Sequence, residues 1–293
     1  MLGIVNLDKP VGPTSHDMVD LVRRLTGIRR IGHAGTLDPL ASGVLPILIG
    51  AATRFSDDLT GGLKCYDAVI RLGIRSATDD AQGPLTPGGS APDVGAVAAA
   101  LGSFVGTFEQ RPPAFSARKV GGIVAHRAAR SGKPIDVAPR RVTVEAIDIL
   151  GSEAGDGWLD VRCDLRCGPG TYIRSIARDL GDRLGCGGHL HALRRTVAAG
   201  LSIDQALDPE QLQELARAGR LEEAVMPIAP LLRLPHLPLA ADDADRFAHG
   251  AAVPVRAGAG RHAVFSADTL LGIGIVHDGM LEPRTVIATP ELA

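Results

Sequence analysis

A chain of 293 residues with 45% hydrophobic and 22% charged residues has the composition of an ordinary globular protein, with length for one large domain and a small one. No apolar run approaches the roughly 20 residues of a membrane span. The N-terminus has no basic stretch followed by an apolar one, so we expect no secretory signal and a cytoplasmic location. The net charge of −2 hides an asymmetry, because residues 1–200 carry 24 Lys and Arg against 20 Asp and Glu, and residues 201–293 carry 7 against 13.

The first third of the chain predicts strands and short helices around one glycine-rich loop. Thr14 or Ser15 can cap the first helix, and Asp17 lies where a capping box has its partner. The loop, GHAGTLDPLASG at residues 32–43, is poor in helix and strand formers. In chain order we expect a strand at 3–7, a helix from 14 or 15 to 25, a buried strand at 44–49, a helix at 51–59 and an alternating strand at 65–72.

The rest of the chain predicts antiparallel pairs and then a second region rich in strands. In chain order we expect a surface loop at 83–92, a helix at 94–104, a strand at 106–110, paired strands at 142–150 and 159–167 joined by the loop GSEAGDG, a helix at 171–184, a strand at 189–197, a helical acidic segment at about 209–225 and short strands from 232 onward. This order favours an α+β fold, in which a mixed, largely antiparallel sheet with flanking helices precedes a small β-rich domain.

Residues 111–141 form a basic segment that interrupts this pattern. It contains eight basic residues and a single acidic one, Asp136. They are Arg111, Arg118, Lys119, Arg127, Arg130, Lys133, Arg140 and Arg141. A basic segment can bind a polyanion whatever the total charge, because salt screening confines its field to about 10 Å. A solvated helix face is the alternative, but such a face usually mixes Glu with Arg. The segment therefore favours RNA or another phosphate polymer as partner.

Asp38, in the glycine-rich loop, is the first candidate for chemistry. An Asp before Pro is often only a turn former. Apolar neighbours such as Leu37 and Leu40 favour a packed loop instead, and Arg174, which opens a helix after Gly168, Pro169 and Gly170, is a possible counter-ion. An Arg close to the carboxylate would keep it ionised, as a nucleophile or a base requires.

Tyr66 and His33 are further candidates, each with a structural alternative. Tyr66 can stack on one flipped base or can be a core aromatic. His33 can fill the space left by an extruded base, act as a base, or be an ordinary loop residue. The four cysteines show no CxxC pair and no zinc spacing, so we expect buried free thiols and no metal. Nucleotide-binding loops are absent from the sequence as well.

The glycine-rich loop, together with GIVNLDKPVGPTSHD before it, resembles the TruB family of tRNA pseudouridine synthases. Further segments match in the family's order over roughly residues 2–200: KCYDAVIRLG, QRPPAFSARKVGG, GTYIRSIARDLG and LRR at 193–195. The C-terminal segments FAHGAAVPV and LLGIGIVHDGMLEPRTVI are more loosely similar to PUA-like RNA-binding modules. The resemblance implies a catalytic domain of residues 1–230 with an inserted thumb at about 108–140, followed by a PUA-like domain of residues 231–293.

The resemblance also implies a reaction and roles for single residues. The enzyme would isomerise the uridine at position 55 in the T-loop of tRNA to pseudouridine after flipping the base, with neither cofactor nor metal. Asp38 would be catalytic, with Arg174 paired to it, while Tyr66 and Leu193 contact the base. His33 would fill the vacated gap, and Lys9, next to Pro10, would support the site. Thumb residues Arg118, Lys119, Arg127, Arg130 and Lys133 would bind the T-arm.

Two departures from the family's pattern are visible, Cys65 before the tyrosine and SATDDAQG at 76–83, and we expect neither to touch the chemistry. We expect a monomer that binds tRNA and needs no guide RNA and no membrane. A guide-RNA-dependent synthase of the dyskerin type and a non-catalytic tRNA-binding or tRNA-folding protein are the alternatives. Whether Asp38 attacks the ring, attacks the sugar or removes a sugar proton stays open.

Overall fold

The computed structural model describes residues 1–115, 119–124, 128, 131, 135 and 137–287. Its main feature is a nine-stranded sheet in which the pair β3–β12 is parallel and the other neighbours are antiparallel. The spatial order is β1 (Gly3–Lys9), β3 (Ala41–Ile49), β12 (Gly188–Ala198), β4 (Lys64–Leu72), β11 (Trp158–Cys167), β10 (Arg140–Gly155) and β7 (Gly106–Gln110), with β2 (Ile31–His33) on β3 and β13 (Leu201–Ser202) on β12. The mixed, antiparallel-rich sheet confirms the predicted α+β class.

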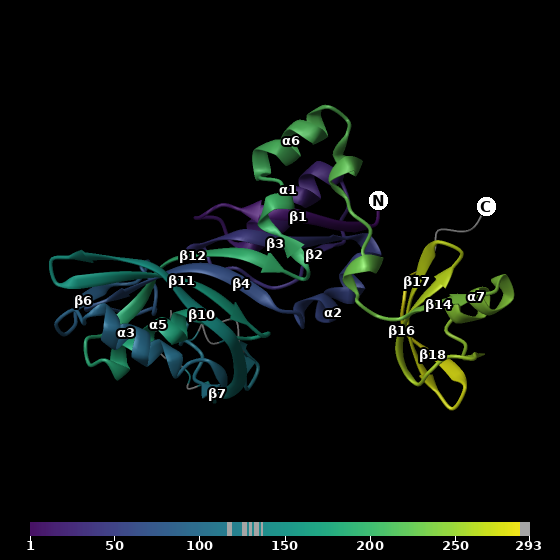
Figure 1. Cartoon of the computed structure of the whole chain (residues 1–293). Coiled ribbons are helices and arrows are strands. Elements are labelled where there is room, and N and C mark those ends of the chain that lie inside the picture. Colours follow the sequence, from purple (N-terminus) through teal and green to yellow (C-terminus); the bar gives the residue numbers. More distant parts are fainter. Residues whose placement is uncertain (116–118, 125–127, 129–130, 132–134, 136, 288–293) are drawn as a thin grey trace.

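Helices cover this sheet in two places (Figure 1). α3 (Val94–Gly102) and α5 (Ile173–Arg183) pack on one face of β4, β11 and β12, whereas α1 (Ser15–Thr26) and α6 (Pro209–Arg217) pack on β1 and β3. The capping box predicted for α1 is present, because the Thr14 hydroxyl accepts from the Asp17 amide and the Asp17 carboxylate accepts from the Thr14 amide. Two of these helices contact the loop that carries Asp38, α1 through Ser15 and α5 through Arg174.

β3 and β4 show why the sequence pattern identified them. The continuous apolar run of β3 is buried on both faces, since alternate residues enter two different cores. In β4 buried and partly buried residues alternate, so Lys64, Tyr66 and Ala68 share one face. Three of the four free cysteines are buried and Cys65 is partly buried.

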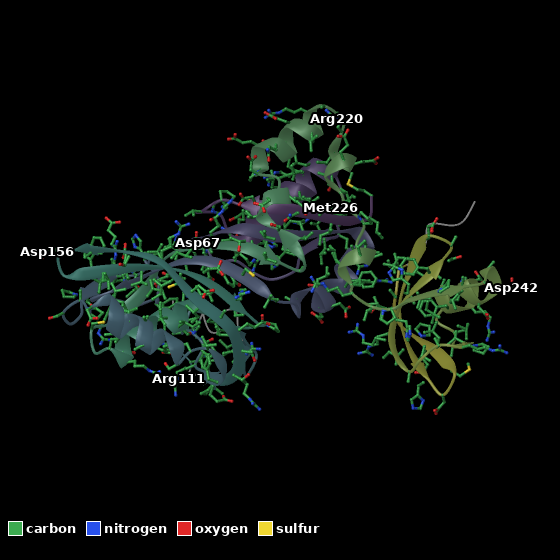
Figure 2. All side chains as sticks on the ribbon, in the orientation of Figure 1. Asp67, Arg111, Asp156, Arg220, Met226 and Asp242 are labelled. Atoms are coloured by element: carbon green, nitrogen blue, oxygen red, sulfur yellow. The ribbon has the colours of Figure 1, made fainter. Side chains whose placement is uncertain are left out.

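Three predicted elements are wrong in detail. The loop predicted for GSEAGDG is mostly strand, because β10 continues to Gly155 and turns at Asp156, the tip of the hairpin (Figure 2). The predicted helix at 51–59 is a 3-10 helix, η1 (Gly50–Phe55), followed by α2 (Ser56–Thr60). The acidic segment contains α6 and a separate 3-10 helix, η3 (Leu221–Ala224), since Gly219 has a positive φ of 69°.

A five-stranded sheet forms the C-terminal part. Its order is β14 (His236–Leu239), β16 (Gly260–Ser266), β17 (Thr269–His277), β18 (Met280–Val286) and β15 (Val253–Pro254). The sequence pattern missed its helix, α7 (Ala241–Ala248), in which Asp242 lies at the opposite end of the molecule from Asp156 (Figure 2).

This second sheet lies beside α2 (Figure 1). Arg261 pairs with Asp58, the Arg54 guanidinium donates to the Val286 carbonyl, and Ile273 packs in one core with residues of the first sheet.

The remaining described elements are short. They are β5 (Ile74–Ser76) with β6 (Leu85–Pro87), which lies inside the predicted surface loop, β8 (Lys119–Val120) with β9 (Ile123–Val124), and the 3-10 helices η2 (Ile203–Gln205) and η4 (Ala229–Leu231). Among the helices in the described part of the chain, none has both the length and the apolar character that a membrane crossing requires.

Candidate active site

A cavity of about 500 Å³ lies where the glycine-rich loop, α5 and the face of β4 and β12 meet. Its lining includes the Asp38 loop, the residues that lead into α5, and Tyr66, Leu193 and Arg195 from the sheet. The charged groups that line it are the cations Lys64, Arg140, Arg174 and Arg195 and the carboxylates Asp38 and Asp57. Four cations against two carboxylates give the cavity an excess of positive charge.

Asp38 and Arg174 meet in this cavity. The Arg174 Nη2 atom lies 2.9 Å from Asp38 Oδ2. The Arg174 side chain is 6% exposed, whereas that of Asp38 is 41% exposed. The carboxylate is therefore accessible from the cavity, while its arginine partner is buried. A charge-assisted bond of this kind is short and directional, so it orients the Asp38 carboxylate. The counter-ion predicted from the sequence is confirmed as a contact.

The loop that carries Asp38 is packed, as its apolar residues predicted. Leu37 is buried, and the Ser15 hydroxyl of α1 donates to the Leu37 carbonyl (2.9 Å) and accepts from the Leu37 amide (2.8 Å). Gly35 has a positive φ of 96°, a conformation that favours glycine. After Asp38, the Gly12 amide donates to the Pro39 carbonyl (2.8 Å), so the loop backbone is held on both sides of Asp38.

Arg174 is held by the loop at residues 76–83, contrary to the expectation that this loop does not touch the chemistry. Arg174 Nη1 donates to the Thr78 carbonyl (3.2 Å) and lies 3.5 Å from Asp80 Oδ2. Asp80 is buried and accepts from the Thr78 hydroxyl and the Gln82 amide. The position of Arg174 in the first turn of α5 is unfavourable for a cation, since the helix dipole is positive there, and the two carboxylates offset this cost.

Tyr66 is a buried wall of the cavity. Burial raises its pKa to about 12, although the positive charge of the nearby Arg195 acts in the opposite direction. The phenol is therefore protonated at neutral pH. Leu193 of β12 lies opposite Ala68 of β4 and lines the same cavity. Both residues predicted to contact a base thus share the cavity with Asp38.

Lys9 and His33 lie near the loop and do not line the cavity. Lys9 is fully buried, and its Nζ donates to the carbonyls of Pro10 (2.8 Å) and Pro13 (2.7 Å), which agrees with a supporting role. Burial lowers the pKa of Lys9 to about 8. His33 is in β2, and burial is also the main cause that lowers its pKa. Its Nδ1 atom is buried with no partner in the described residues.

The predicted thumb residues fall mostly outside the described residues. Arg118, Arg127, Arg130 and Lys133 are among those not described, and of Lys119 only the backbone, in β8, is described. At the base of this segment, the Gln110 side-chain amide donates to the Tyr172 carbonyl (3.0 Å) and accepts from its amide (2.9 Å).

Arg195 is a further residue of the site, to which the sequence alone assigned no role although it lies in the LRR motif at 193–195. Arg195 is 1% exposed and lies opposite Tyr66 in the β12–β4 pair. Its guanidinium donates to the carbonyls of Val44 (2.8 Å), Thr36 (3.3 Å) and Gly35 (2.9 Å). The signal that could have found it is the strand period of two, which puts it on the same face as Leu193.

The same reasoning applies to Lys64 and Tyr172. Lys64 comes two residues before Tyr66 in β4, and Tyr172 two residues before Arg174 at the start of α5; both line the cavity. In the described part of the chain, no group of three or more His, Cys, Asp or Glu residues is arranged to hold a metal ion.

Comparisons with known proteins agree with this geometry. Residues 23–173 match the family model "TruB family pseudouridylate synthase (N terminal domain)", and residues 174–233 match "tRNA pseudouridylate synthase B C-terminal domain". The boundary between the two models falls inside α5, so both contribute to the nine-stranded sheet.

Relatives and solved structures match over almost the whole chain. The tRNA pseudouridine synthase B of Acaryochloris marina is 43% identical over 98% of this chain and 99% of its own length. The tRNA pseudouridine synthase B of Ralstonia nicotianae is 40% identical over 97% of this chain and 94% of its own length. A chain in the crystal structure of a Cbf5-Nop10-Gar1 complex is 26% identical and superposes with a TM-score of 0.72, covering 97% of this chain and 84% of its own. These matches show that the chain belongs to the TruB family of pseudouridylate synthases, which makes it a pseudouridine synthase.

Proposed function

We propose that this chain converts the uridine at position 55, in the T-loop of tRNA, into pseudouridine, with Asp38 as the catalytic carboxylate. The observation that carries the proposal is the 2.9 Å pair between Asp38 and the buried Arg174, in one cavity with Tyr66 and Leu193. The relatives over nearly the full length are named tRNA pseudouridine synthase B, which supports tRNA as the substrate.

The isomerisation breaks the bond between C1′ and N1, turns the uracil, and joins C1′ to C5. The C5 proton leaves and N1 gains a proton, so atoms and electrons balance without an oxidant or a second substrate. Asp38 acts either as a nucleophile on the ring or the sugar, or as the base that removes a sugar proton. Each route needs an ionised carboxylate in a fixed position, and the bond from the Arg174 guanidinium would hold it there.

A uridine in a folded loop must leave its stack before it can reach Asp38, and extrusion costs a few kcal/mol. Stacking on an aromatic side chain returns about 1–3 kcal/mol per base. Tyr66, which lines the cavity, would supply this contact, and the predicted basic thumb would hold the backbone of the T-arm. His33 would fill the vacated position, and Lys9 would support the site through the Pro10 and Pro13 carbonyls, to which it donates.

The C-terminal sheet completes the proposal. We place the domain boundary near residue 231, before β14, and assign the second domain to the PUA-like class of RNA-binding modules. Helix α7 of this domain is acidic, so we expect the domain to contact phosphates through a different face. We expect the protein to act as a monomer in the cytoplasm, without a guide RNA.

Release of tritium from C5-tritiated uridine in a T-arm stem-loop tests the proposal. The wild-type protein should release tritium without any guide RNA, and Asp38→Ala should bind the stem-loop but release none. Tritium release by Asp38→Ala would refute the role of Asp38. Activity of the wild-type protein only with an added guide RNA would favour the dyskerin type, and no activity with intact binding would favour a non-catalytic tRNA-binding protein.

A further inference from the structure

The charges that line the cavity are not balanced within the protein. Arg174 is offset by Asp38 and Asp80. Lys64 and Arg195 are buried as well, and neither has a carboxylate partner in the part of the chain that the structure describes. Keeping a cation away from water costs free energy, and neutral carbonyls offset that cost only in part. An anionic group that enters the cavity would therefore gain from these cations.

Of Lys64 and Arg195, it is Lys64 that has an N–H donor left for a ligand. Its Nζ donates to the carbonyls of Thr60 (2.8 Å) and Gly62 (3.1 Å), at the C-terminal end of α2. An ammonium group has three N–H donors, so one remains beyond these two bonds. Arg195 instead donates through all three guanidinium nitrogens, to two loop carbonyls and to the Val44 carbonyl of β3. Burial also lowers the pKa of Lys64, as expected for an ammonium without an anion beside it.

The position of Lys64 relative to Tyr66 indicates which anion fits. The two residues are on the same face of β4, two positions apart, and a strand rises about 3.3–3.4 Å per residue, so they are about 7 Å apart along the strand. In a nucleotide, the sugar separates the base from its flanking phosphates by a comparable span. A base that rests on Tyr66 therefore brings one of its phosphates to Lys64.

We propose that Lys64 binds one of the two phosphates that flank the target uridine, and thereby sets the position of that nucleotide against Asp38. This assignment rests on the proposed function, because it needs an RNA nucleotide in the cavity. It gives Lys64 a role that differs from that of the thumb. A thumb cation would contribute to holding the T-arm, whereas Lys64 acts on the flipped nucleotide alone.

Steady-state kinetics on a T-arm stem-loop at several salt concentrations test the proposal. Lys64→Met should raise KM about 10- to 100-fold, the loss expected for a hydrogen bond to a charged group, with a smaller change in kcat. The dependence of log KM on log salt should become shallower by about 0.7, the value of one phosphate contact to a single strand. Arg217→Met, which removes one exposed cation from α6, is the matched control and should change neither quantity.

Substrates with one neutral methylphosphonate linkage make the test independent of how the variant folds. With the wild-type protein, neutralising the 5′ or the 3′ linkage of the target uridine should raise KM, and a linkage in the distal stem should not. The sensitive linkage should lose its effect in Lys64→Met and keep it in Lys64→Arg.

Equal sensitivity of wild-type and Lys64→Met to both flanking linkages would overturn the proposal, as would an unchanged KM in Lys64→Met. Either result would leave the proposed function intact, provided the wild-type protein forms pseudouridine in the unmodified stem-loop. Failure of that reaction would instead refute the function itself.

Discussion

Two arginines reach the same cavity from different sides and are stabilised in different ways. Arg174, at the start of α5, contacts the carboxylates of Asp38 and Asp80 and the Thr78 and Phe115 carbonyls. Arg195, on β12, contacts three backbone carbonyls of the loop and strand around Asp38 and the hydroxyl of Tyr66. Arg174 is thus part of an ionic network, whereas Arg195 is a cation held by uncharged carbonyl groups.

The difference separates two tasks. The α5 side holds the position of the Asp38 carboxylate, because its contacts end on carboxylate oxygens. The β12 side controls the shape of the loop, because its contacts end on the Gly35, Thr36 and Val44 carbonyls. Loss of Arg174 should therefore affect chemistry more than folding, and loss of Arg195 should affect folding as well.

The largest effect is expected for Arg174→Met. We expect kcat to fall about 100- to 1,000-fold, the range seen when one electrostatic partner is removed from an active site, with a much smaller change in the affinity for the T-arm stem-loop. Single-turnover formation of pseudouridine measures the first quantity, and filter binding measures the second. Arg178→Met is the matched control, since Arg178 is one turn further along α5 and pairs with Asp79 outside the cavity lining. Equal losses in both variants would contradict the comparison.

Arg195→Met should give a smaller loss in rate and a clear loss in stability. The substitution removes the donor from the buried Val44 carbonyl and from the partly buried Thr36 and Gly35 carbonyls, at about 1–3 kcal/mol for a group left unsatisfied away from water. It also removes a buried charge. We expect a net loss of about 3 kcal/mol in the free energy of unfolding, measured by urea denaturation, and faster amide exchange at residues 35–37. Arg194→Met, which breaks a partly exposed pair with Asp8, should cost about 1 kcal/mol. Unfolding free energies that are equal in the two variants would show that the loop does not depend on Arg195.

Lys9 is a second buried cation that backbone carbonyls hold, as they hold Arg195, and its substitution should have the smallest effect of the three. Its ammonium is also held by neutral carbonyls, and burial lowers its pKa to about 8, from an ordinary value of about 10.4 in the unfolded chain. Between these two pH values the unfolded chain keeps a proton that the folded chain has released. The free energy of unfolding should therefore rise with pH in this window, by at most about 1.4 kcal/mol per unit from this group.

Lys9→Met should remove that contribution, so the stability of wild-type relative to variant should increase from pH 8 to pH 10. Chemical denaturation of both proteins at each pH measures the difference. A difference that stays constant across the window would contradict a lowered pKa for Lys9.

Most of the fold could be predicted because its strands carry strong periodic signals. The alternation in β4 and the unbroken apolar run of β3 are direct consequences of burial on one face and on two. The misplaced loop after residue 150 shows the limit of this reasoning. Glycine and exposed polar residues suggest a turn, but β10 continues there as half of an exposed hairpin, stabilised by its pairing with β11.

Of the candidate site, the sequence supplied Asp38, Tyr66 and Arg174, and it could not supply the groups that hold them. The Thr78 carbonyl and Asp80 reach Arg174 from about 95 residues away in the chain, and no local pattern encodes that contact. Arg195 and Lys64 carried a usable signal, since each lies two positions from a residue already assigned to the cavity. Every residue has a backbone carbonyl, so the amino-acid sequence does not indicate which carbonyls accept from a given side chain. The bonds from Arg195 to the Gly35, Thr36 and Val44 carbonyls could therefore be identified only in the structure.

The most direct test of the central claim, that Asp38 converts uridine 55 of tRNA, is pseudouridine mapping of an unmodified tRNA transcript. The transcript is treated with wild-type or Asp38→Ala protein, then with carbodiimide, and read by primer extension. We predict a single new stop that reports position 55 after treatment with wild-type protein, and none after treatment with Asp38→Ala. A stop at position 55 with Asp38→Ala, or stops only at other positions with the wild-type protein, would contradict the account.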